Sequence, residues 1–101
     1  MTIFYNFIPR RILIEFYVMT DELAAARRKI DALDLRIAAL LARRFAAAAP
    51  LRRLKGKAAD PARERRVLAN ARRAAGKTTY AAGVSAVFSE IVRQTKRLQP
   101  R

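Results

Sequence analysis

Several polar side chains stand in this chain at positions where the helical pattern predicts apolar residues. An apolar stripe recurs every seven residues at Leu23, Ile30 and Ile37, and its next position is Arg44. Burying an unpaired charge costs free energy, so a charge at such a position favours a partner or a ligand. Arg44 and five further polar residues would together suit an enclosed site for an anion with several oxygens. The five others are Lys55, Asp60, Glu64, Thr95 and Gln99.

The angular spacing of the cations assigns them to different sites. Lys55 lies eleven residues after Arg44. On a continuous helix it returns to within about 20° of the same face, about 16 Å further along the axis. Arg27 lies seventeen residues before Arg44, about 100° away around the helix, so the two cannot share a site on their own helix. Arg27 could instead reach the equivalent site of a second chain.

Each of these residues also has an ordinary structural explanation when it is taken singly. Arg44 could extend along the surface or pair with an internal carboxylate, and Lys55 could be a solvated charge beside a loop. Glu64 could be a helix-stabilising acid in a first turn. Thr95 and Gln99 could mark a frayed C-terminus. The set as a whole favours the binding site over these separate explanations.

Composition limits the chemistry and indicates the kind of partner. The chain has no Cys and no His, which excludes thiol nucleophiles, disulfides, Ser-His-Asp triads and the usual zinc sites. Lys and Arg total 22 against 8 Asp and Glu, a net charge of +14, so nucleic acid, a membrane surface or an acidic metabolite are the candidate partners. A chain of 101 residues forms one domain with a modest core, which favours self-association.

Residues 1–18 differ in composition from the rest of the chain. They are rich in aromatic and β-branched residues and contain Pro9, which predicts an extended or irregular segment. Charged residues inside the segment make it too short to span a bilayer, and Glu15 disfavours a signal peptide. We treat residues 1–18 as an N-terminal extension of unknown role. The alternative is an upstream-start artefact, with Met19 as the true start and Thr20 as a helix cap.

The remainder, residues 19–101, predicts an all-α domain of three helices without a strand. A long helix runs from Leu23 towards Lys55, and Pro50 should kink or break it. Asp60 and Pro61 predict the cap and first residue of a second helix, which Gly76 ends near Ala75. Its inward residues are Val67, Leu68, Ala71 and Ala75. A third helix, capped by Thr78 or Thr79, has a predicted apolar stripe of Tyr80, Val84, Val87, Phe88, Ile91 and Val92.

Residues 20–99 resemble the all-helical chorismate mutases. The resemblance rests on AARRKIDALDLRIAALLARR, on Lys55, on DPARERRVLANAR and on VFSEIVRQTKRLQ, and it is specific in combination. It implies an intertwined homodimer in which the long first helix spans both active sites. It also implies a cytoplasmic enzyme of aromatic amino-acid biosynthesis, in the shikimate pathway, that rearranges the dicarboxylate chorismate to prephenate. No cofactor, metal, nucleic acid or membrane is expected to take part.

The resemblance also implies a role for each site residue. Arg44, and Arg27 from the partner chain, are expected to hold the substrate carboxylates. Lys55 and Gln99 are expected to face the breaking ether oxygen, and Glu64 to bind the ring hydroxyl. Asp60, Arg63 and Thr95 fall at further substrate-binding positions of the family.

Departures from the family pattern leave other functions open. Pro50 interrupts a segment that is continuous helix in the family, the connection from Lys55 to Asp60 is short, and residues 1–18 have no counterpart. An isochorismate-pyruvate lyase, an aminodeoxychorismate mutase and a degenerate mutase without activity share the same helices. A basic helical protein that binds nucleic acid is the alternative from a different class. It predicts salt-dependent retention on DNA or RNA, although no recognised nucleic-acid module is present.

Overall fold

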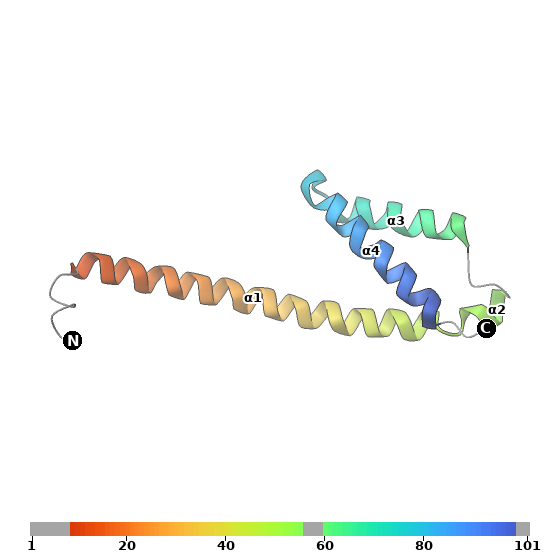
Figure 1. Ribbon diagram of the computed structural model, residues 1–101, viewed down its shortest axis with the longest axis horizontal. Helices are drawn as coiled ribbons and strands as arrows, with labels where there is room; N and C mark the ends of the chain where they lie inside the picture. The colour runs from red at the N-terminus through yellow and green to blue at the C-terminus, as the bar shows by residue number, and fades with distance from the viewer. Residues whose placement is uncertain (1–8, 56–59, 99–101) are drawn as a thin grey trace. The chain divides into compact units, whose positions relative to one another are not determined.

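The structure, a computed structural model, describes residues 9–55 and 60–98, without the side chains of Arg52 and Lys55. It contains four helices: α1 (Arg10–Ala48), α2 (Leu51–Lys55), α3 (Pro61–Ala75) and α4 (Thr78–Leu98). Figure 1 shows α1 as one uninterrupted helix and α3 and α4 packed side by side. No strand occurs in these two ranges, so the predicted all-α class is confirmed. The chain divides into two units, Met1–Leu40 and Leu41–Arg101.

Helix α1 begins at Arg10, and this corrects the prediction of an extended or irregular segment up to residue 18. Pro9 stands just before the helix, where its missing N–H is not needed, and its carbonyl accepts hydrogen bonds from the amides of Ile12 and Leu13. Aromatic and β-branched residues lose only a few tenths of a kcal/mol in a helix, about what one or two favourable pairs restore. One such pair is Arg11 with Glu15 at 3.5 Å. Residues 1–8 lie outside the described range.

Thr20 lies inside α1, so it does not cap a helix in this chain, and its role as a cap in a chain that starts at Met19 stays a prediction. Its hydroxyl donates to the carbonyls of Phe16 and Tyr17 at 3.0 and 2.9 Å. A threonine hydroxyl bonded back to the preceding turn is compatible with a continuing helix, because it does not remove any backbone hydrogen bond. The acidic residues that follow Thr20 therefore lie in the middle of a helix and not in its first turn.

Pro50 separates α1 from α2, as predicted from its missing N–H. The amide of Ala49 still donates to the carbonyl of Phe45 at 2.9 Å, and the helical pattern stops at the following residue. The chain then forms one short turn, in which the amide of Arg53 donates to the carbonyl of Pro50 at 3.1 Å. The predicted long run is thus two helices with a break between them.

The predicted ends of α3 are confirmed by its capping contacts. The carboxylate of Asp60 accepts a hydrogen bond from the amide of Arg63 at 3.1 Å, and Pro61 is the first helical residue. Gly76 ends the helix with a φ of 74°, a left-handed conformation that favours glycine. Helix α4 begins immediately afterwards at Thr78, so both proposed caps, Thr78 and Thr79, are already helical residues.

The packed faces of α3 and α4 agree with most of the predicted stripes. Ala71 and Ile91 are buried, and Val67, Val84 and Phe88 are partly covered. Two members of the predicted third stripe, Tyr80 and Val87, are instead 59% and 58% exposed. Ala81 is buried in their place, because small residues allow the two helices to approach closely where the hairpin turns.

Most of the apolar surface of α1 is exposed in the single chain. Among the described residues only Ala71, Ala81 and Ile91 form a buried apolar core. Large apolar residues of α1 with exposed side chains recur at heptad spacing, at Ile12, Phe16, Met19, Leu23, Ile30, Leu33, Ile37 and Leu40. We call this set the α1 seam. None of the described helices is apolar and long enough to cross a membrane.

The cap of α3 gives a prediction about stability. We expect Asp60→Ala to lower the free energy of unfolding by about 1 kcal/mol, because the amide of Arg63 loses its acceptor. Asp60→Asn should retain most of the stability, because asparagine caps as well as aspartate. Urea unfolding of the three proteins at one concentration measures the difference. Equal midpoints for the Ala and Asn variants would contradict the capping role.

Candidate functional site

A pocket of about 240 Å³ lies within the unit Leu41–Arg101. The end of α1, the short α2, the first turns of α3 and the last turns of α4 all contribute to it. Its walls combine small apolar residues with five charged side chains and one hydroxyl. The lining residues are Arg44, Ala47, Ala48, Leu51, Asp60, Arg63, Glu64, Val67, Val92, Thr95 and Lys96.

Arg44 is held in the pocket by a hydrogen bond to α4. Its Nη1 donates to the Oγ1 of Thr95 at 3.0 Å. The Thr95 hydroxyl in turn donates to the carbonyl of Ile91 at 2.6 Å, so its proton is used within its own helix and its oxygen is available to the guanidinium. Thr95 is only 9% exposed. This arrangement fixes one edge of Arg44, whose planar group carries five N–H donors in all.

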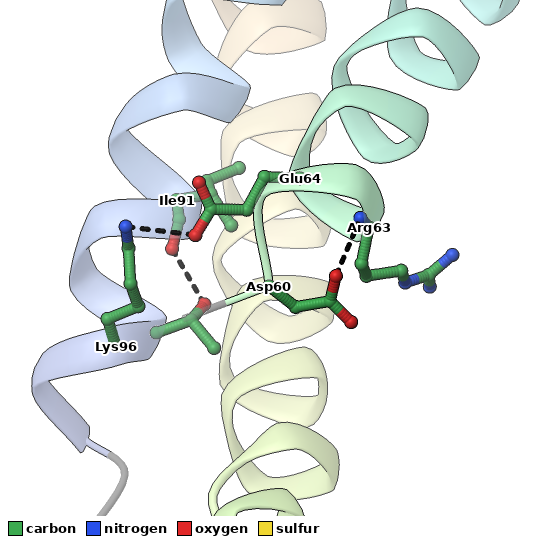
Figure 2. A network of polar contacts seen from close by, with 6 residues as sticks. Asp60, Arg63, Glu64, Ile91 and Lys96 are labelled. Atoms are coloured by element: carbon green, nitrogen blue, oxygen red, sulfur yellow. Dashed lines mark hydrogen bonds and ion pairs between the residues drawn. The ribbon is translucent and has the colours of Figure 1, made fainter. Parts of the chain in front are cut away.

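Asp60 and Arg63 enter the pocket wall from the start of α3. Because Asp60 is the N-cap, one of its carboxylate oxygens is already engaged by the amide of Arg63. Figure 2 shows this bond, with the Arg63 side chain extending away from Glu64. The structure therefore gives Asp60 a clear structural task in addition to its place in the wall.

Glu64 forms an ion pair that the sequence did not lead us to predict. Its Oε1 lies 2.9 Å from the Nζ of Lys96 on α4. The two side chains are 30% and 40% exposed, and Figure 2 shows them pointing toward one another from their two helices. Lys96 and Arg97 are the basic residues of the last turn of α4, which is where surface cations commonly stabilise a helix. No signal in the sequence separates Lys96 from an ordinary cation of a last turn, because Glu64 meets it only in the folded chain.

The structure brings together five of the residues predicted for the site: Arg44, Asp60, Arg63, Glu64 and Thr95. Arg27 is an exposed residue of α1 in the other unit and is not among the lining residues. Lys55 is the last residue of α2, but its side chain lies outside the described part of the structure, as does the whole of Gln99. The roles of these residues remain predictions.

The charges of the pocket favour an anionic ligand that also carries a neutral polar group. Arg44, Arg63 and Lys96 are cationic and Asp60 and Glu64 are anionic, so the described lining carries one net positive charge. Arginine binds a carboxylate through two parallel hydrogen bonds, and a glutamate accepts a hydrogen bond from a hydroxyl. In the described part of the chain no group of acidic residues could hold a metal ion.

The comparison with protein families identifies a matching family. The model of the chorismate mutase type II family matches residues 26–100, well over half of the 101 residues. This range contains every residue of the pocket. Neither the curated proteins nor the solved structures gave a significant match.

The contact between Arg44 and Thr95 can be tested by a double-mutant cycle. We expect Arg44→Met and Thr95→Val, alone and combined, to show a coupling energy of about 1 kcal/mol in denaturant unfolding, the usual size for a hydrogen bond to a charged group that is partly exposed. A second cycle with Thr95→Ser in place of Thr95→Val should show little coupling energy, because serine keeps the hydroxyl that Arg44 contacts and the substitution does not remove the hydrogen bond. Additive effects of the Met and Val substitutions would show that the two side chains are independent.

Proposed function

Because the chain belongs to the chorismate mutase type II family, we propose that it rearranges chorismate to prephenate without a cofactor. The observation that carries the proposal is a guanidinium, that of Arg44, fixed by Thr95 in a pocket that Glu64 also lines. The guanidinium suits a substrate carboxylate, and the glutamate suits the ring hydroxyl. A substrate with both groups on one small ring fits the chemistry of this lining.

The proposed reaction needs no group that removes a proton. A pericyclic rearrangement breaks and forms its bonds within one molecule, so the protein accelerates it by holding the reactive conformer. It also places positive charge where negative charge develops on the ether oxygen. We assign this second task to Lys55 and Gln99, on the family resemblance of their positions. Arg44 is assigned the carboxylate, because its hydrogen bond to Thr95 orients the fork before the substrate arrives.

We further propose that the active form is a homodimer joined along the α1 seam. The exposure of its residues, for example 55% for Ile30 and 53% for Leu33, leaves more apolar surface uncovered than a monomeric protein usually presents. Arg27 lies beside this seam on α1 and would then be the residue that each chain contributes to its partner's site. The seam begins at Ile12, before the matched range, so residues 10–25 extend the proposed interface.

The proposed activity predicts a large effect of Arg44→Met. We expect kcat/KM for chorismate to fall by about 100-fold or more, because one substrate carboxylate loses its bidentate partner. The measurement is the conversion of chorismate with identification of the product. Prephenate supports the mutase, whereas release of pyruvate from isochorismate, offered in a separate assay, would assign a lyase.

The matched control for this substitution is Arg72→Met. Arg72 is an exposed arginine of α3 outside the pocket, so its loss changes the net charge equally and should leave kcat/KM unchanged within about twofold. An unaltered protein that is folded and dimeric but leaves chorismate unconverted would refute the proposed function.

The proposed sharing of sites predicts that two inactive variants restore activity together. Chains with Arg27→Met and chains with Arg44→Met, refolded together in equal amounts, should recover about one quarter of the unaltered activity, because half the dimers are mixed and each mixed dimer has one intact site. Chorismate conversion before and after mixing measures the recovery. If Arg27 served the site of its own chain, no mixed dimer would contain an intact site and no activity would return.

Two leucines of α1 provide the control for the interface. Leu33 belongs to the seam, whereas Leu35 is 73% exposed and lies off it. Leu33→Glu in both chains should prevent the recovery and lower the sedimentation coefficient, because a charge placed in an apolar interface is costly. Leu35→Glu should change neither quantity.

A further inference from the structure

We propose that Lys96 makes the pocket select a neutral hydroxyl over a protonated amine on the ring of its substrate. This inference rests on the proposed function and concerns the substituent that Glu64 would recognise. Chorismate carries a hydroxyl where aminodeoxychorismate carries an amine, and an aliphatic amine is protonated near pH 7. The two compounds therefore differ by one positive charge at this position.

Lys96 lies where its positive charge offsets the negative charge of Glu64 in the pocket. Its Nζ lies 2.9 Å from the Oε1 of Glu64, within the distance of a charge-assisted hydrogen bond. The two residues come from different helices, α4 and α3, and Figure 2 shows the ammonium directed at the carboxylate. Both residues line the pocket.

The pair also forms part of a wall between two hollows. A second pocket, of about 210 Å³, is lined by Leu68, Ser89 and Arg93 together with three residues of the first pocket. These shared residues are Glu64, Val92 and Lys96. A ligand in the first pocket that approaches Glu64 therefore approaches Lys96 as well.

The charge of Glu64 alone would favour an amine. A carboxylate attracts an ammonium group more strongly than a neutral hydroxyl, because a charge–charge interaction is added to the hydrogen bond. With Lys96 beside it, Glu64 is neutralised in advance, and the lysine repels a second cation at short range. The carboxylate still has lone pairs that can accept a hydrogen bond from a neutral hydroxyl. The ion pair thus removes the charge–charge attraction that would favour the amine. The hydrogen bond from a neutral hydroxyl to the carboxylate remains.

The experiment measures selectivity in the full-length protein. The quantity is the inhibition constant of aminodeoxychorismate against chorismate turnover, divided by the KM for chorismate. We expect Lys96→Met to lower this ratio about tenfold, which corresponds to ~1.4 kcal/mol. Lys96→Arg keeps the charge and should retain most of the selectivity, which a purely structural role of the side chain would not explain.

Arg97→Met is the matched control. Arg97 is the exposed neighbour of Lys96 on α4 and does not line the pocket, so its removal changes the net charge by the same amount. We expect the ratio to stay unchanged in this variant. Helix content and the unfolding midpoint of each variant show that the comparison is made between folded proteins.

The possible outcomes separate this inference from the proposed function. A ratio that falls in Lys96→Met alone, with recovery in Lys96→Arg, supports the role of Lys96. An unchanged ratio in Lys96→Met, or an equal fall in Arg97→Met, overturns it even when chorismate is converted normally. If the unaltered protein converts no chorismate, the proposed function itself fails.

Discussion

The hydrogen bond between Arg44 and Thr95 is the interaction on which the arrangement of the candidate site depends. It joins the end of the long α1 to the last turns of α4 across 51 positions of sequence. Thr95 can accept this bond because its own proton is directed to the carbonyl of Ile91, in a buried position. A serine or threonine is therefore suited to this place, since an apolar residue of the same shape would leave the guanidinium without its acceptor.

The remaining polar residues of the pocket are positioned by the ends of helices. Asp60 caps α3, which fixes the direction in which Glu64 leaves the first turn, and Glu64 then meets Lys96. The site therefore needs few buried residues: backbone capping and two polar contacts between helices hold it in a unit whose apolar core is small. The cost is that such contacts are partly exposed to water, where each contributes modest stability. A second chain along the α1 seam would supply the burial that a single chain lacks.

The sequence predicted those features that depend on local spacing and missed those that depend on neighbours. The cap at Asp60, the break at Pro50 and the end at Gly76 follow from residue types whose backbone preferences are strong. Arg44 and Thr95 could be found by continuing the apolar stripes of their helices.

Lys96, in contrast, looks like an ordinary cation of a last turn until Glu64 is placed opposite it in space. The helical conformation of residues 10–18 was missed for a related reason, because β propensity reports the fit to a sheet and no sheet is present in the described residues. The role of Arg27 stays a prediction, since a residue proposed to serve a partner chain leaves no contact in the single chain.

Pro50 shows how a break in a helix can be compatible with the site. A proline removes one hydrogen bond and would direct the following residues away from the axis of α1. In the structure the helix is interrupted for two residues between α1 and α2. Leu51 of α2 then lines the pocket together with Ala47 and Ala48. The break therefore does not remove the following segment from the site. It ends α1 one turn after Arg44, so the arginine is positioned by α1 and α4, while Lys55 belongs to a separate short helix. If Lys55 acts on the substrate as proposed, its approach depends on α2 and not on the axis of α1.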